Sequence, residues 1–159
     1  MRVVSGLLLL GLATVPLQAK APMRTGAPES PIAASVEVPA GSRLVYVSGQ
    51  VPDIVNAAAA EGSVDRFGDT ETQTRSVIRK IDGVLKANGL GLGDVVMMRV
   101  FLVAPPGQQR MDFQGMMRAY RASFGTAEQP NKPARSTMQV AGLVDPGWLV
   151  EIEVTAAKK

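Results

Sequence analysis

The spacing of apolar residues changes in a definite order along residues 43–156, and this order constrains the fold more than any other feature. Two segments carry apolar residues every three or four positions, which is the spacing of an amphipathic helix. One begins at Thr70 and ends at Asn88-Gly89, and the other covers 113–124. Segments rich in β-branched or continuously apolar residues predict strands. The predicted strands are 43–49, 95–103, 133–140 and 148–156.

The expected order of elements is therefore strand, helix, strand, helix, strand, strand. Thr70-x-x-Gln73 is a capping-box pattern that predicts the start of the first helix, and Asn88-Gly89 supplies a left-handed stop. The apolar run at 95–103, interrupted by Arg99, predicts a central strand covered on both faces. We expect one α+β domain with a mixed β-sheet and both helices packed on one face.

Alternation in the last predicted strand places Glu151 and Glu153 on one side of the sheet and apolar residues on the other. In the preceding strand Arg135 and Thr137 also share a side. We expect the two polar sides to lie together and to bring Arg135 near a carboxylate. From spacing alone, a structural ion pair is the simpler interpretation. A polar sheet face is also typical of a ligand cleft or a subunit interface, so a small homo-oligomer is expected.

The composition limits the possible chemistry. The 159-residue chain contains no histidine and no cysteine, so the commonest general base, the thiol nucleophile and the best transition-metal ligands are missing. Acidic residues at 65, 69 and 71 are best explained by the dipole of the first helix, so no metal site is expected. A net charge of +3 and 4% aromatic residues also argue against nucleic-acid binding.

The first 19 residues predict an export signal. Met1-Arg2 is basic, residues 3–15 are apolar but too few to span a bilayer, and Ala19 and Ala21 offer cleavage sites. The expected mature protein is periplasmic or secreted, without stable membrane association after cleavage. It would consist of a linker at 20–39 and a domain at 40–159. Translation from Met23 is the alternative, and it would leave the same domain in the cytoplasm.

Several short motifs follow one another across the predicted domain. They are Tyr46-Val-Ser-Gly-Gln-Val-Pro52, Thr72-Gln-Thr74, Asn88-Gly-Leu90 before Asp94-Val-Val96, Val100-Phe-Leu102, Pro133-Ala-Arg-Ser-Thr137 and Leu149-Val-Glu-Ile-Glu153. Together and in this order they resemble the reactive intermediate deaminase family, RidA, also called YjgF. The resemblance implies a chorismate-mutase-like α+β fold and a homotrimer with inward-facing sheets. It also implies substrate clefts between neighbouring subunits.

The activity implied by the resemblance is hydrolysis of 2-imino or 2-enamino acids to 2-keto acids and ammonia, without a metal or an organic cofactor. Arg135 matches an arginine that would hold the substrate carboxylate through two charge-assisted hydrogen bonds. Glu151, rather than Glu153, matches the acidic residue and would orient the attacking water. The small residues that line the family's cleft match Ser48, Gly49 and Thr137.

The chain departs from the family pattern at three places. Ala33-Ala34-Ser35 stands where many members have Gly-Pro-Tyr, Met117 where an asparagine is common, and Thr137 where a cysteine is frequent. The missing tyrosine and asparagine matches support a second hypothesis, a non-catalytic trimer that binds small carboxylates or a protein partner. A third activity sometimes attached to the family, ribonuclease or translation inhibition, is disfavoured by the missing histidine, the weak charge and the few aromatic residues.

Overall fold

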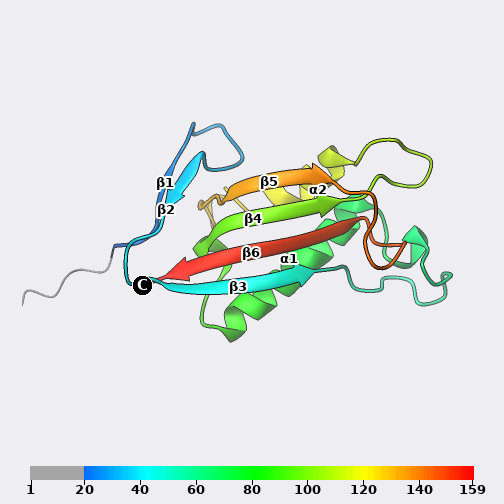
Figure 1. Cartoon of the computed structure of the whole chain (residues 1–159), viewed down its shortest axis with the longest axis horizontal. Helices are drawn as coiled ribbons and strands as arrows, with labels where there is room; N and C mark the ends of the chain where they lie inside the picture. Colours follow the sequence, from blue (N-terminus) through cyan, green and yellow to red (C-terminus); the bar gives the residue numbers. More distant parts are fainter. Residues whose placement is uncertain (1–19) are drawn as a thin grey trace, which may run out of the picture.

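The computed structural model describes residues 20–159, which form a four-stranded sheet with two α-helices behind it (Figure 1). The strands are β3 (Arg43–Gln50), β4 (Val95–Leu102), β5 (Ala134–Gln139) and β6 (Val150–Lys158). They lie in the order β3-β6-β4-β5, with β4 and β5 parallel and the other neighbours antiparallel. The predicted mixed sheet and the predicted order of its elements are confirmed.

Helices α1 (Thr70–Ala87) and α2 (Phe113–Arg121) contact each other and cover the same face of the sheet (Figure 1). Their apolar sides meet alternate residues of the strands, as strand alternation requires. The central members of this core are Val77, Ile81, Leu85, Met98, Val100, Met116, Tyr120, Ile152 and Val154. The prediction that both helices pack on one face is confirmed. Neither helix of the described chain is long and apolar enough to cross a membrane.

The side of the sheet away from the helices is called here the open face. It carries Tyr46, Met97, Arg99, Phe101, Met138, Glu151, Glu153 and Thr155. The prediction that β4 is covered on both faces is wrong for this chain, because Met97 and Phe101 are only half-buried and Arg99 is exposed. An apolar run in a sequence predicts a strand that is buried on both faces, but it does not reveal whether the residues that cover the second face belong to the same chain.

Two short strands, β1 (Met23–Thr25) and β2 (Ser35–Glu37), form a separate antiparallel hairpin in the segment predicted as a linker. The Arg24 guanidinium ties this hairpin to the domain by donating to the carbonyl oxygens of Gly93 at 3.0 Å and Val95 at 3.2 Å. Single 3-10 turns, η1 (Val64–Arg66) and η2 (Leu92–Asp94), precede α1 and β4. The predicted export signal lies outside the described residues.

The start of α1 differs from the prediction by one residue. Asp69, not Thr70, is the N-cap, and its carboxylate accepts from the Thr72 N–H at 2.8 Å. Gln73 therefore does not act in a capping box. Its fully buried side chain donates to the carbonyl oxygens of Gly68 and Gly147 at 2.9 Å, and it accepts from the Leu149 N–H at 2.7 Å. The predicted stop after α1 is confirmed, with Gly89 at a φ of 69°.

Gln73 joins α1 to the turn before β6, so its replacement by leucine should destabilise the domain. Leucine keeps most of the volume but leaves one N–H and one or more carbonyl groups buried without a partner. We expect Gln73→Leu to lower the free energy of unfolding by about 2–4 kcal/mol in urea titrations. The exposed Gln114→Leu in α2 is the control and should change it by less than ~0.5 kcal/mol. Equal values for the two variants would contradict the assigned role of Gln73.

Candidate functional site

Arg135 lies on the helix face of the sheet, where β5 packs beside α2. It pairs in register with Met98, whose side chain is buried under the helices. The Arg135 guanidinium lies 4.3 Å from the ring centroid of Tyr120 and 6.0 Å from that of Phe113. Its Nη2 is 3.2 Å from Sδ of Met117. A cation is thus held against aromatic and thioether groups, which attract it but are poor hydrogen-bond acceptors.

The four residues of α2 that surround Arg135 form an aromatic and thioether box, made of Phe113, Met116, Met117 and Tyr120. Their spacing of three and four residues predicts an apolar helix face, and this is confirmed. The spacing does not reveal that Arg135 packs against this same helix face. That contact follows only from the position of β5 beside α2, which the sequence does not show.

No carboxylate in residues 20–159 lies within ion-pair distance of the Arg135 guanidinium. Burial lowers the pKa of Arg135, the charge interaction with Tyr120 opposes this shift, and Arg121 adds to it. Burial also raises the pKa of Tyr120 to about 12, so its hydroxyl stays protonated at neutral pH and donates to the Pro31 carbonyl at 3.0 Å. Arg135 is therefore a partly desolvated cation without a counter-ion in residues 20–159, which suits it to bind an anion.

Glu151 lies on the open face of the sheet. It pairs in register with Phe101 on β4, and its side chain reaches across to β3. At Gly49 a Cβ atom would overlap the carboxylate of Glu151, so only glycine leaves room for this position of the side chain. Val47 pairs with Val154 and Gln50 with Ile152, so β3 has a bulge at Ser48-Gly49. The predicted site residues Ser48, Gly49 and Glu151 are thus brought together.

Arg135 and Glu151 lie on opposite faces of the sheet, so the prediction that the two polar sides lie together is wrong within one chain. The parallel pairing with β4 directs Arg135 and Thr137 toward the helices, because these residues pair with buried Met98 and Val100. The structural ion pair of Arg135 with Glu151 or Glu153 is also absent from the described part of the chain. Among the described residues, Glu153 instead pairs with Arg99 at 2.7 Å.

Thr137, two residues beyond Arg135, lies on the same helix face. Its Oγ1 is buried and has no hydrogen-bond partner within residues 20–159. Ser35, the position of a common family tyrosine, lies on β2 and bonds to the Thr25 hydroxyl at 2.7 Å. On the side that faces α2, Arg135 contacts Met117 and Tyr120. Ser35 supplies no aromatic ring at the position of the family tyrosine.

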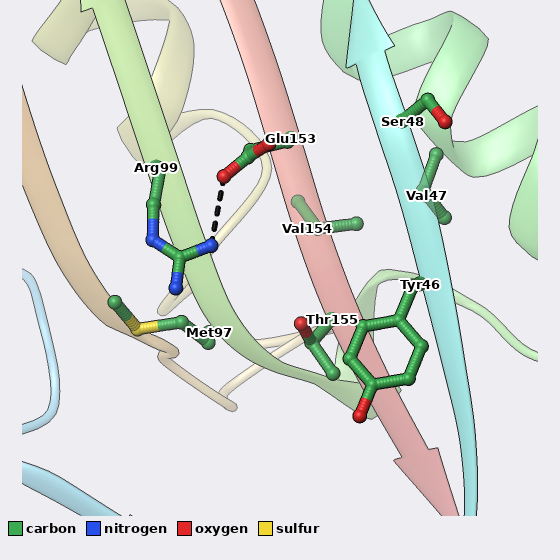
Figure 2. Close-up of a pocket in the computed structure, with 8 residues that line it drawn as sticks. All are labelled: Tyr46, Val47, Ser48, Met97, Arg99, Glu153, Val154 and Thr155. Carbon is green, nitrogen blue, oxygen red and sulfur yellow. Dashed lines mark hydrogen bonds and ion pairs between the residues drawn. The ribbon is translucent and has the colours of Figure 1, made fainter.

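A cleft of about 210 Å³ opens on the open face beside Ser48 (Figure 2). Tyr46 and Thr155 form one side of it, and the Arg99–Glu153 ion pair forms the other (Figure 2). Within the described part of the chain, no group of three acidic side chains is placed to hold a metal ion. The chemistry available on this face is that of carboxylates, hydroxyls, backbone groups and the Arg99 guanidinium, which is paired with Glu153.

Comparison with known proteins gives a consistent result over nearly the whole described chain. The family model described as endoribonuclease L-PSP matches residues 26–158. A RutC family protein of Pyrococcus horikoshii is 33% identical over 125 residues, which cover 79% of this chain and 86% of the relative. The 3-aminoacrylate deaminase RutC of Acinetobacter baylyi is 32% identical over 126 residues, or 79% of this chain and 88% of that enzyme.

A solved structure of TdcF from E. coli, with bound serine, has the same fold. It aligns with a TM-score of 0.57 at 27% identity, over 87% of this chain and 94% of that one. The predicted resemblance is confirmed, and the chain belongs to the RidA/YjgF/L-PSP family, which includes RutC.

Proposed function

We propose that this protein hydrolyses 2-imino and 2-enamino acids to 2-keto acids and ammonia. The observation that carries the proposal is the Arg135 guanidinium, which is partly desolvated and has no carboxylate partner among the described residues. Such a group suits the carboxylate that every 2-imino acid carries next to its C=N bond. The similarity to a 3-aminoacrylate deaminase and to a protein crystallised with serine supports a small ligand that carries both a carboxylate and a nitrogen.

In the proposed reaction Arg135 holds the substrate carboxylate by two parallel hydrogen bonds and so fixes the C=N carbon in place. Glu151 orients a water molecule toward that carbon and accepts one of its protons. The C–O bond forms as the C=N π electrons move to nitrogen, which is protonated. The resulting carbinolamine then expels ammonia, and its hydroxyl becomes the keto oxygen. Water is the only co-reactant.

The active unit would be a homotrimer in which each site lies between two protomers. The opposite placement of Arg135 and Glu151 supports a site shared between protomers, since the two faces of one sheet cannot bring both residues to the same ligand. Arg135 lies on the edge strand β5, where a second protomer has access. The open face also exposes apolar surface that a neighbour would cover, with Tyr46 at 75% exposure, Leu44 at 42% and Met138 at 37%.

A binding protein without catalytic activity is the second candidate. The observation that favours it is the sulfur of Met117 beside Arg135, which offers a ligand no strong polar contact for orientation. Ser35, exposed on β2, supplies none either. Calorimetry that shows binding of a 2-keto acid, together with no turnover of freshly generated 2-iminopropanoate, would favour this candidate.

Two replacements of Arg135 test whether its pair of hydrogen bonds or only its positive charge is needed to bind the substrate carboxylate. Arg135→Ala should lower kcat/KM for 2-iminopropanoate by about 100-fold or more, because two charge-assisted hydrogen bonds are lost. Arg135→Lys keeps the charge but not the planar pair of donors, so it should restore only part of the activity. Ammonia and pyruvate release from the freshly generated imine is the measurement. Arg110→Ala, an exposed arginine, is the control, and an Arg135→Ala variant as active as wild type would end the proposal.

Mixing two inactive variants tests whether the site is shared. In trimers reassembled from equal amounts of Arg135→Ala and Glu151→Gln, about a quarter of the interfaces would combine an intact Arg135 with an intact Glu151. Activity should therefore return to about a quarter of the wild-type value after co-refolding, while each variant refolded alone stays inactive. No recovery, with mixed trimers demonstrated by differential tags, would place both residues in the site of one protomer.

Gly49 should be required for the position of Glu151 rather than for folding. In Gly49→Ala the new methyl group overlaps the flexible end of the Glu151 side chain, which must swing away. We expect kcat to fall by about tenfold or more, with less than ~1 kcal/mol lost in the free energy of unfolding. Gly91→Ala is the matched control, since a Cβ at Gly91 meets nothing within 4 Å. Unchanged kcat in Gly49→Ala would argue against a role for Glu151.

A further inference from the structure

A second and larger cleft, called here the Trp148 cleft, lies where the loop after β3 meets the turn before β6. Its volume is about 570 Å³, within the range of roughly 300–1,000 Å³ that is typical of small-molecule sites. The loop supplies Val51, Ile54 and Phe67, and the turn supplies Asp145 and Trp148. These two segments meet at one end of the sheet (Figure 1). Neither Arg135 nor Glu151 lines the Trp148 cleft, so it is separate from the proposed catalytic site.

One wall of the Trp148 cleft is aromatic and apolar. The rings of Phe67 and Trp148 meet edge to face, with centroids 6.2 Å apart and planes at 73°. Gly147 allows this contact, because a Cβ there would lie 2.8 Å from the Phe67 ring and 2.5 Å from the Ser63 carbonyl oxygen. Ile54 continues the wall outward and is 50% exposed. The wall is suited to an apolar side chain.

The charged groups of the Trp148 cleft are only partly neutralised by one another. Lys80 and Asp53 form an ion pair at 3.3 Å. Arg66 donates to backbone carbonyl oxygens, at 3.0 and 3.2 Å, and has no carboxylate within ion-pair distance in residues 20–159.

Two carboxylates of the cleft also lack a cation within the described chain. Asp145 accepts only a backbone N–H, that of Gly147 at 2.8 Å. Glu61 is exposed and forms no ion pair there. Counted over residues 20–159, one unpaired cation and two unpaired carboxylates thus share the cleft with an aromatic wall.

We propose that the Trp148 cleft binds a free α-amino acid with an apolar side chain. The ligand carboxylate would pair with Arg66, its ammonium group with Asp145 and Glu61, and its side chain would pack against Phe67 and Trp148. A simple anion would meet two carboxylates, and a simple amine would leave Arg66 without a partner. A zwitterion satisfies both signs of charge.

The bound amino acid would not be a substrate of the proposed reaction. Its Cα is saturated, so it has no C=N bond for water to attack. The Trp148 cleft would therefore hold a ligand that the protein does not consume, and the proposal stands whether or not the deaminase activity is found. Leucine, whose side chain matches the apolar wall, is the probe of choice.

Trp148 is the only tryptophan of the chain and lines the cleft, so its fluorescence reports binding directly. Titration of the full-length protein with L-leucine should give a saturable change with a Kd of about 1 mM or tighter, and calorimetry should give the same Kd. 3-Methylbutylamine, which lacks the carboxylate, and 4-methylpentanoate, which lacks the amine, should each bind at least ~10-fold more weakly. Equal affinity for all three compounds, or no signal by either method, would overturn the proposal.

Variants locate the bound leucine. Asp145→Asn keeps the acceptor for the Gly147 N–H and removes the charge, so it should weaken leucine binding by about tenfold. Asp65→Asn, an exposed acid of η1 that does not line the cleft, is the matched control and should bind as wild type. Arg135→Ala should also bind leucine as wild type. Loss of binding in Arg135→Ala, or wild-type binding in Asp145→Asn, would place the leucine elsewhere and contradict the proposal.

Discussion

The parallel pairing of β5 with β4 decides what Arg135 can do. In this register Arg135 lies beside Met98 and points toward α2, away from the carboxylates of β6. A shift by one residue would move its side chain to the other face, because successive side chains of a strand alternate. Arg135 would then lie on the same face as Glu151 and Glu153, and a structural ion pair would become available. In the observed register, Arg135 and Glu151 therefore cannot form an ion pair with each other within one chain.

The box around Arg135 holds the guanidinium without neutralising it. Tyr120 offers the face of its ring at 4.3 Å, and such a cation–π contact is worth roughly 0.5–2 kcal/mol depending on exposure. The Tyr120 hydroxyl donates to the Pro31 carbonyl oxygen at 3.0 Å, and this hydrogen bond holds the Tyr120 ring in place under the guanidinium. A guanidinium has five N–H donors, and thioether sulfurs are weak acceptors for them. The burial cost of this cation is thus only partly offset inside the chain, and a bound anion would offset the rest.

The sequence was sufficient to predict the elements of the sheet and the helices that cover it, because each has a clear apolar period. The family motifs also named Ser48, Gly49 and Glu151 as site residues, and the structure places Gly49 against the Glu151 side chain, while their role in a site stays a prediction. The position of Arg135 was not predictable, since alternation shows which residues share a face but not which face the pairing with β4 selects. The role of Gln73 was missed for a similar reason, because its partners Gly147 and Leu149 are distant in the sequence.

Met117 lies beside Arg135 and affects how the guanidinium would bind a substrate carboxylate, but it does not prevent that binding. An asparagine at this position would offer Arg135 a strong amide acceptor, and a ligand carboxylate would have to displace it or share the guanidinium with it. The Met117 sulfur, at 3.2 Å, competes weakly and keeps the surroundings apolar. Hydrogen bonds to a charged group strengthen as the local dielectric falls. The thioether therefore favours tight carboxylate binding while supplying no polar contact that orients the rest of a ligand, so orientation would depend on groups from the open face of a neighbouring protomer.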